Sequence, residues 1–334
     1  MDWIRNCWQV AAYAKDVGDA LLPRTFLGED VVLFRDAGGT AHALADRCAH
    51  RCLPLSRGRL LGDIVQCGYH GMRFHPDGTC EGVPGQDTIP PRAVVQAYPV
   101  AERHGFIWIW MGDAAAADAA VVPNAMWFAN PEWATATGYH HMDAEYRLVI
   151  DNLLDLSHET FVHAETIGNG AVADSPVTAQ IVDGRVKVHR FMANCPPPPF
   201  YVQTTGVTTH IDRWHTTYYE PPGFVLIENG SMPAGSGMAA AKERRVVNFI
   251  TPETATSSHY FWGVARQWEL ANVELTEKIR KDVIATFDQD KVLLEAQQRV
   301  LSSDPRLAAF PVTIKIDAGP ILGRRLLEAS IAGK

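Results

Sequence analysis

The sequence predicts an α+β protein of two domains, and three features of the chain lead to this prediction. Before residue 115, short apolar runs such as VVLF, HALA and FIWIWM alternate with turn sequences such as DAGG and HPDG, which is typical of a small antiparallel β-sandwich. An alanine-rich stretch at 113–120 then indicates a linker or a short helix. Beyond it, helical patterns at both ends enclose a group of strands, which is typical of an antiparallel sheet with helices.

Each element of the second domain, residues 116–334, has its own signal. An apolar segment with interleaved acids at 143–163 predicts a helix. Apolar residues at helical spacing predict a long amphipathic helix from about 273 to 302. Strands are expected around 178–192, 213–229 and 244–265. Two irregular segments are expected: an extended run from Pro196 to Pro199 and a surface loop at 234–241.

Composition narrows the classes of protein that the chain can be. Its 334 residues are 47% hydrophobic, which is ordinary for a globular protein, and the formal net charge of −8 disfavours nucleic acid as a partner. Six cysteines without dense spacing do not make a disulfide scaffold, so we expect a reducing cytoplasm. The N-terminus does not resemble a signal peptide, and no apolar run is long enough to span a membrane.

The most informative motif is C-x-H-x16-C-x2-H, formed by Cys48, His50, Cys67 and His70. Two thiolates paired with two imidazoles predict a Rieske [2Fe–2S] cluster, in which one iron is held by the cysteines and the other by the histidines. Each half of the motif carries one ligand of each kind. The glycines and the proline around the motif favour two tight loop tips from which the ligands converge.

Two other interpretations of these residues remain. A structural zinc site uses the same residue types, although zinc fingers favour C-x2-4-C and H-x3-5-H pairs. Cysteines without a metal are commonly buried as small apolar side chains, which is the second alternative. Four cysteines lie outside the motif, and we expect them to be structural thiols: Cys7, Cys52, Cys80 and Cys195.

A second motif, N-x2-D-x2-H-x4-H, contains Asn152, Asp155, His158 and His163. In a helix the first three would stay near one face, whereas His163 would lie roughly 140° around from His158. Both imidazoles can reach one metal only if the helix ends or bulges between them. Two histidines and a carboxylate form the facial triad of non-haem Fe(II) oxygenases, so this segment predicts a metal site. The alternative is a set of ordinary hydrogen-bonded residues.

The missing carboxylate is expected in the predicted C-terminal helix. Asp290 lies three residues after Phe287, on the apolar stripe of that helix, whereas Asp288 lies off the stripe and is expected to be solvated. Buried carboxylates are normally paired or bound to a metal. Asp290 is therefore the predicted third ligand, and a salt bridge to a buried arginine is the alternative.

At this point the chain resembles a known family nearly from end to end. It is similar to the oxygenase components of Rieske non-haem iron aromatic O-demethylases, closest to vanillate O-demethylases and more distantly to dicamba O-demethylase. The shared motifs are NCWQVAAYA, CAHR with PLSRG, CGYHG, VPGQD, ERHGFIWIW, DNLLDLSHETFVHA, FITPET, FDQDKVLLEAQQR, IDAG and RR. The chain departs from the pattern at Cys52-Leu53-Pro54 and at His75.

The resemblance implies a fold and a set of site residues. It implies a Rieske domain at 1–115 and a helix-grip (StAR-related-like) catalytic domain at 116–334. The mononuclear iron would be bound by His158, His163 and Asp290, while catalytic roles fall to Asp155 and Asn152. Asp155 resembles the acid that joins a cluster histidine of one subunit to an iron histidine of the next, so a homotrimer is implied. Asn248 occupies a position that contacts substrate in one relative, and an ordinary structural amide is the alternative.

The resemblance also implies an activity and its partners. Electrons from a separate NAD(P)H-dependent flavin and ferredoxin-type reductase, together with O2, would oxidise an aryl methyl ether such as vanillate to protocatechuate and formaldehyde. Related toluenesulfonate monooxygenases hydroxylate a ring methyl group instead. A Rieske electron carrier and a binding module with a vestigial metal site are the remaining alternatives. The chain has no G-x-G-x-x-G fingerprint, so it is not expected to use NADH by itself.

Overall fold

The computed structural model describes residues 3–304, 306–307 and 312–333. The chain forms two compact units: residues 1–124 with 253–255 make the first, and residues 125–252 with 256–334 make the second. The units divide between Asn124 and Ala125, whereas the sequence places a division near residue 115. The alanine-rich stretch between these two positions contains two short 3-10 turns, η3 (Ala114–Ala116) and η4 (Ala119–Val121).

The described residues of the first unit form three small antiparallel sheets, as its alternating short runs predict. In one sheet β11 lies between β1 and β10, in the second the order is β2-β3-β4-β9, and in the third it is β5-β6-β7-β8. The strands are β1 (Trp8–Tyr13), β2 (Leu22–Phe26), β3 (Glu29–Arg35), β4 (Ala41–Ala45), β5 (Arg59–Leu61), β6 (Ile64–Gln66), β7 (Arg73–Phe74), β8 (Cys80–Gly82), β9 (Ala97–Tyr98), β10 (Val100–Arg103) and β11 (Phe106–Trp110). The 3-10 turns η1 (Ala14–Asp16) and η2 (Leu55–Arg57) lie in the connections.

The second unit is built on one antiparallel sheet with the order β12-β18-β17-β16-β15-β14-β13. Neighbouring strands of this order are mostly consecutive in the chain. Short turns connect β13 to β14 and β15 to β16, whereas the connection from β14 to β15 contains a helix; β12 is the exception and pairs with the last strand. The strands are β12 (Ala134–Met142), β13 (Val177–Val182), β14 (Arg185–Cys195), β15 (Ile211–Glu220), β16 (Phe224–Pro233), β17 (Lys242–Pro252) and β18 (Ser258–Arg266).

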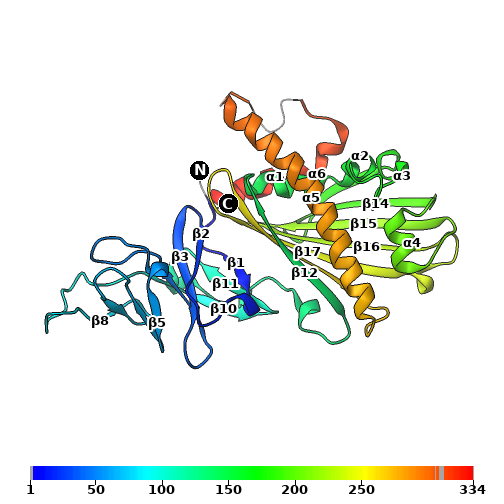
Figure 1. Ribbon diagram of the computed structural model, residues 1–334. Helices are drawn as coiled ribbons and strands as arrows, with labels where there is room; N and C mark the ends of the chain where they lie inside the picture. The colour runs from blue at the N-terminus through cyan, green and yellow to red at the C-terminus, as the bar shows by residue number, and fades with distance from the viewer. Residues whose placement is uncertain (1–2, 305, 308–311, 334) are drawn as a thin grey trace. The chain divides into compact units, whose positions relative to one another are not determined.

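One long helix, α5 (Val273–Ser303), crosses this sheet (Figure 1). Its 31 residues span about 46 Å, and Asn272 caps the first turn by accepting a hydrogen bond from the Leu275 amide. The remaining helices are α1 (Tyr146–Leu154), α2 (Glu159–Val162), α3 (Gly170–Asp174), α4 (Pro199–Thr205) and α6 (Ala318–Ile331). The 3-10 turns are η5 (Met126–Phe128), η6 (Leu156–His158), η7 (Met238–Ala240) and η8 (Lys315–Asp317).

Helix α6 holds the end of α1 that leads into the second motif. A Cβ atom at Gly319 would lie 2.8 Å from the Leu154 carbonyl oxygen, so only glycine permits this close approach of the two helices. Arg324 of α6 donates to the Asp151 carboxylate over 2.5 Å. These contacts orient the C-terminal end of α1 toward the sheet.

The predicted α+β class is confirmed, and the long helix begins and ends within one residue of its predicted bounds. Two details of the second unit differ from the prediction. Pro199 does not continue the extended run, because it is the first residue of α4, a position that the fixed φ of proline favours. Strand β12 has no predicted counterpart, because its inward positions include Ala136 and His140 in place of large apolar residues.

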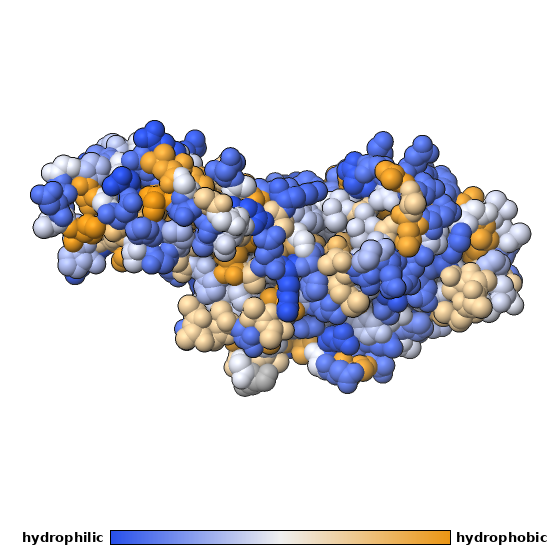
Figure 2. Space-filling model, turned by 90° about the horizontal axis from the view of Figure 1, so that it is seen from below, coloured by the Kyte–Doolittle hydropathy of each residue, from blue (hydrophilic) through white to orange (hydrophobic). Residues whose placement is uncertain are grey.

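The two units have separate hydrophobic cores. In the first, Phe26, Phe34 and Phe74 are completely buried. In the second, a cluster that includes Tyr201, Ile211 and Ile279 lies between the sheet and the helices. The face shown in Figure 2 is predominantly hydrophilic, with apolar residues in small groups. Within the described ranges, no helix combines the length and the apolar character that crossing a bilayer requires.

Candidate metal centres

The four residues of the first motif lie in two adjacent loops of the first unit. Cys48 and His50 precede η2, and Cys67 and His70 occupy the turn between β6 and β7. The Cys52 amide donates to the Cys48 carbonyl, and the Gly71 amide donates to the Cys67 carbonyl, so each loop closes on its own cysteine. The rings of His50 and His70 are 4.5 Å apart between centroids. The structure therefore brings together all four predicted cluster residues.

Two glycines allow these loops to pack backbone against backbone. A Cβ atom at Gly58 would lie 2.0 Å from the Gln66 carbonyl oxygen, and one at Gly68 would lie 2.6 Å from the Arg57 carbonyl oxygen. Neither position can therefore accept a side chain without movement of the main chain. Asp46 adds a further restraint, because its carboxylate accepts hydrogen bonds from the amide and the hydroxyl of Ser56.

Burial divides the four cluster residues into two kinds. Both cysteines are 2% exposed and unbridged, whereas both histidines lie at the surface. Burial, and then the neighbouring Cys67 thiol, raises the pKa of Cys48 to about 11. A buried pair of thiols ionises readily only when a cation compensates its charge, because coordination to a metal deprotonates a thiol. The donor set thus fits an iron pair whose histidine side faces outward.

The second motif breaks the helix that its spacing would otherwise continue. Helix α1 ends at Leu154, and Asp155 has an extended backbone with φ −120° and ψ 95°. The Asp155 carboxylate accepts a hydrogen bond from the Ser157 amide and so caps η6, after which α2 begins at Glu159. This break lies before His158, whereas the sequence places it between the two histidines. Between them the 3-10 turn η6 ends at His158 and α2 ends at Val162, directly before His163.

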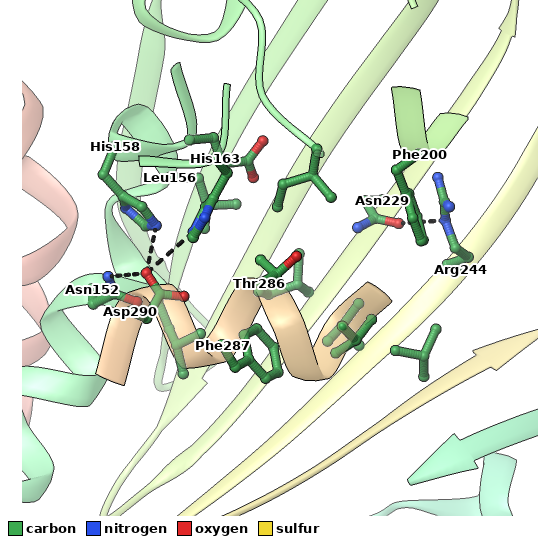
Figure 3. A pocket seen from close by; sticks show the side chains of 17 residues that line it. Asn152, Leu156, His158, His163, Phe200, Asn229, Arg244, Thr286, Phe287 and Asp290 are labelled. Atoms are coloured by element: carbon green, nitrogen blue, oxygen red, sulfur yellow. Dashed lines mark hydrogen bonds and ion pairs between the residues drawn. The ribbon is translucent and has the colours of Figure 1, made fainter. Parts of the chain in front are cut away.

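Three side chains converge to form the second candidate centre. His158, His163 and Asp290 each present a ligand atom, and these atoms lie within 4.8 Å of one another. The Asp290 Oδ1 atom is 3.5 Å from His158 Nε2 and 3.2 Å from His163 Nε2. Asn152 donates to the same Oδ1 atom over 3.1 Å (Figure 3). Asp288 lies two residues earlier in α5, on a different face of the helix, and its side chain is 60% exposed, as predicted.

The Nδ1 atoms of both histidines, which point away from Asp290, form hydrogen bonds. His158 Nδ1 lies 2.5 Å from the Asp155 carbonyl oxygen, and His163 Nδ1 lies 2.7 Å from Gln289 Oε1. Because both partners are acceptors, each Nδ1 carries a proton, and in the neutral ring, the form that binds a metal, each Nε2 presents a lone pair. Two lone pairs and a carboxylate that face one another fit a bound cation, with the outer hydrogen bonds fixing the ring orientations.

Glu159 is a buried acid at this centre that the sequence did not single out. It is 5% exposed, lies next to His158 in the chain and accepts a hydrogen bond from Arg213 Nη2 over 3.1 Å. Burial raises the pKa of Glu159, although Arg213 opposes that rise. Arg213 Nη2 also donates to His215 Nε2 over 2.7 Å, so this imidazole is neutral, and burial holds its pKa well below the usual range.

A cavity lies beside the triad, with about 660 Å³ of space that protein atoms do not fill. This space includes a part that is open to solvent. Apolar side chains dominate the middle of its wall: Leu153, Leu156, Ile167, Phe200, Ile227, Val246, Val264, Val283 and Phe287. Polar groups lie mainly at its two ends, with the triad and Asn152 at one end and Asn229 and Arg244 at the other, while Thr286 lies between them (Figure 3).

Two predicted residues occupy positions that differ from their expected contacts. Asp155 contacts His158 through its main-chain carbonyl, whereas its carboxylate caps η6. Asn248 is completely buried and does not line the cavity; its amide donates to the Val225 carbonyl and accepts from the Tyr260 hydroxyl over 2.8 Å. The structure therefore places Asn248 within the sheet and away from the triad.

Comparisons with known proteins agree with both centres. The model of the Rieske [2Fe-2S] domain matches residues 7–99, and the model of the vanillate O-demethylase oxygenase C-terminal domain matches residues 142–333. The chain belongs to the family of Rieske non-haem iron oxygenases, in the branch defined by the vanillate O-demethylase oxygenase C-terminal domain. It is an oxygenase component that carries a [2Fe–2S] Rieske cluster and a mononuclear non-haem iron.

Similar proteins match the chain over nearly its whole length. The vanillate O-demethylase oxygenase subunit of Pseudomonas sp. (strain ATCC 19151) is 40% identical, over 92% of this chain and 95% of that protein. The iron-sulfur subunit of a toluene-4-sulfonate monooxygenase system from Comamonas testosteroni is 38% identical, over 98% and 96%. Dicamba monooxygenase bound to 3,6-dichlorosalicylic acid superposes with a TM-score of 0.93 at 29% identity, over 99% and 98%.

Proposed function

We propose that this oxygenase oxidises the methyl group of a small aryl methyl ether such as vanillate, releasing a phenol and formaldehyde. The observation that carries the proposal is the triad of His158, His163 and Asp290 at one end of a cavity whose wall is mostly apolar. An apolar wall binds an aromatic ring, and the polar lining residues at that end of the cavity are the triad, Asn152 and Glu159.

The site residues follow from the donor sets. Cys48, His50, Cys67 and His70 hold the cluster, and His158, His163 and Asp290 hold the iron at three positions, so that further positions stay open. When bound, the two groups supply one-electron transfer and dioxygen activation. Overall, the methyl ether, O2, two electrons and two protons become a hemiacetal and water, and the hemiacetal then collapses to the phenol and formaldehyde.

The protein itself positions and shields the reacting groups. Asn152 fixes the Asp290 carboxylate by donating to Oδ1, and Gln289 fixes the His163 ring through Nδ1. The apolar wall excludes water from the methyl group, which keeps the oxygen chemistry on the substrate. Asp155 has a carboxylate with one hydrogen bond to Ser157, and its second oxygen is the group that we assign to the cluster histidine of a neighbouring subunit.

A second activity, hydroxylation of a ring methyl group, is favoured by one specific comparison. The toluene-4-sulfonate monooxygenase subunit is as similar to this chain as the vanillate O-demethylase subunits are. Both reactions attack a methyl C–H bond next to an aromatic ring system. The product separates them, because only the ether yields formaldehyde.

The partners follow from the family and from the chain's own residues. A separate NAD(P)H-dependent flavin and ferredoxin-type reductase supplies the electrons, and a homotrimer brings the cluster of one subunit beside the iron of the next. The surface histidines of the cluster loops suit such an electron path. We place the protein in the cytoplasm, where NAD(P)H is available and thiols stay reduced.

The test is aerobic turnover by the reconstituted system of oxygenase and reductase. A panel of methoxylated and methylated benzoates and sulfonates is supplied, and formaldehyde and hydroxymethyl products are measured. Formaldehyde release from a methoxybenzoate supports the demethylase, whereas benzylic alcohols alone from methylated substrates support the second activity. No product from either group, with both metals present, overturns the proposal. Turnover with NADH but without reductase contradicts the proposed partner.

A further inference from the structure

Asn229 and Arg244 lie at the end of the cavity opposite the triad, and they have no role in binding iron (Figure 3). They face each other directly on strands β16 and β17. We propose that this pair forms a subsite for the anionic group of the aromatic substrate, a carboxylate or a sulfonate. The inference rests on the proposed function and names the class of substrate that the cavity selects.

Arg244 is a buried cation that lacks an anion. Its side chain is 1% exposed, and its Nη2 atom is buried without a hydrogen-bond partner. Nη1 lies 3.3 Å from the Thr204 hydroxyl, which is a long contact. Among the described residues no carboxylate pairs with Arg244, because the nearby Glu159 is bound to Arg213. A buried charge is costly unless it is paired, so a bound anion would supply the counter-charge that Arg244 lacks within the protein.

Aromatic rings hold the guanidinium in place. The Arg244 guanidinium carbon lies 4.7 Å from the centroid of Phe200, 4.4 Å from that of Tyr201 and 5.9 Å from that of Trp268. These cation–π contacts stabilise the charge in part and restrict the side chain to one orientation. A cation fixed in this way binds an anion without first losing rotamer freedom.

Asn229 adds a donor whose direction Arg244 determines. Arg244 Nε donates to Asn229 Oδ1 over 3.2 Å, so the amide nitrogen must lie on the other side of the group. Figure 3 shows that nitrogen directed toward the interior of the cavity. No acceptor in the described ranges contacts it. An amide donor beside a fixed guanidinium is a donor set that suits the oxygens of a carboxylate or a sulfonate.

The position of the pair also restricts the substitution pattern of the substrate. Because the subsite and the triad lie at opposite ends of the cavity, the anion and the oxidised methyl group must lie on distant edges of the ring. Acids with the methyl or methoxy group in the meta or para position meet this condition. An ortho-substituted acid places both groups on one edge and cannot reach both ends at once.

The test compares binding of matched acids and amides to the iron-loaded holoenzyme. Dissociation constants are measured by calorimetry for 3-methoxybenzoate, 4-methylbenzenesulfonate and the neutral 3-methoxybenzamide. We expect Arg244→Met to weaken binding of both anions about 10- to 100-fold, the usual effect of losing a charge-assisted hydrogen bond, and to leave the amide unchanged. Asn229→Leu should weaken the anions less, and Arg244→Lys should retain part of the preference for the acid.

Arg266→Met is the matched control, because Arg266 is the register partner of Arg244 on β18 and is equally buried. Its guanidinium is satisfied by the Glu269 and Asn272 carbonyls, among others, and it does not line the cavity. This variant should keep the wild-type ratio of acid to amide binding. If Arg244→Met does not fold, the lysine and Asn229 variants still decide the question.

Several outcomes overturn the subsite. One is equal binding of 3-methoxybenzoate and 3-methoxybenzamide by the wild type. Another is an unchanged ratio of acid to amide binding in Arg244→Met, or in both Arg244→Lys and Asn229→Leu. The third is formaldehyde release from 2-methoxybenzoate as fast as from the 3- and 4-isomers. Failure of the proposed function is distinct: the anions would bind through Arg244, yet no methyl group would be oxidised. Whether carboxylate or sulfonate is preferred follows from the two dissociation constants.

Discussion

Asp290 is the residue on which the second centre depends, because its Oδ1 atom is contacted by His158, His163 and Asn152. No buried arginine pairs with it among the described residues, so the salt-bridge alternative finds no support. A carboxylate at this depth without a counter-charge would be costly. A cation at the triad resolves that cost and explains why an acid occupies the apolar stripe of α5.

Replacing Asp290 by alanine should therefore remove one metal and spare the other. We expect the iron content of Asp290→Ala to fall from about three to about two atoms per chain, with the Rieske spectrum intact and turnover lost. Iron analysis and electron paramagnetic resonance measure both centres. Asp288→Ala is the control, because this neighbour is largely exposed and should retain all the iron. Loss of the cluster signal in Asp290→Ala would contradict the separation of the two centres.

Single residues also show where sequence reasoning ends. Asp290 could be predicted because its helical spacing from Phe287 is visible in the chain itself. The role of Arg244 could not be predicted, because it depends on the cross-strand register with Asn229 and on the aromatic rings around the guanidinium. Neither contact is visible in the local sequence. Asn248 is a candidate for substrate contact through the family resemblance alone, and in the structure its amide oxygen accepts a hydrogen bond from the Tyr260 hydroxyl.

At the level of elements, the break between α1 and α2 creates the iron site. Asp155 has two separable functions there, since its carboxylate caps η6 and its carbonyl orients His158. The sequence could predict that a continuous helix is incompatible with two converging imidazoles. It could not show where the break lies, because the local residue types permit a helix throughout.

Two substitutions at Asp155 should separate capping from electron delivery. Asparagine still accepts the hydrogen bond from the Ser157 amide, so Asp155→Asn should keep both metals yet lose turnover by about 10- to 100-fold or more. Asp155→Ala removes the cap as well and should also lower the mononuclear iron content. Iron content and single-turnover rates with a prereduced cluster are the measurements. Full activity of Asp155→Asn would mean that the carboxylate charge has no part in electron transfer.

The packing of the two cluster loops also depends on particular residues, because the loops approach each other closely at glycines. Gly68→Ala would place a methyl group 2.6 Å from the Arg57 carbonyl oxygen, so the loops must separate. We expect this variant to lose the cluster and its visible absorption. Gly18→Ala is the control, because its added Cβ meets no atom within 4 Å. A wild-type spectrum in Gly68→Ala would show that the loops adapt more easily than their packing indicates.

At the level of the whole molecule, the chain combines a complete cluster-binding unit with a complete iron-binding unit. The fold class of both could be predicted, because strand alternation, turn residues and the amphipathic helix are local signals. The edge strand β12 could not be, because it lacks large inward side chains and is held by its pairing with β18. We propose that electrons pass from the cluster of one subunit to the iron of the next, so the electron path would belong to the proposed homotrimer.

The proposed cyclic homotrimer predicts how much activity a mixture of two inactive variants should recover. His70→Ala chains keep the iron triad but lose the cluster, and Asp290→Ala chains keep the cluster but lose the iron. After random subunit exchange, about one quarter of the directed interfaces should join an intact cluster to an intact iron site, so activity should recover to about that fraction of the wild type. Each variant alone, taken through the same exchange, should stay inactive. Differently tagged chains allow heterotrimer formation to be verified by tandem purification. Verified heterotrimers without any recovery would mean that electrons travel within one chain, and the functional reason for the trimer would then be removed.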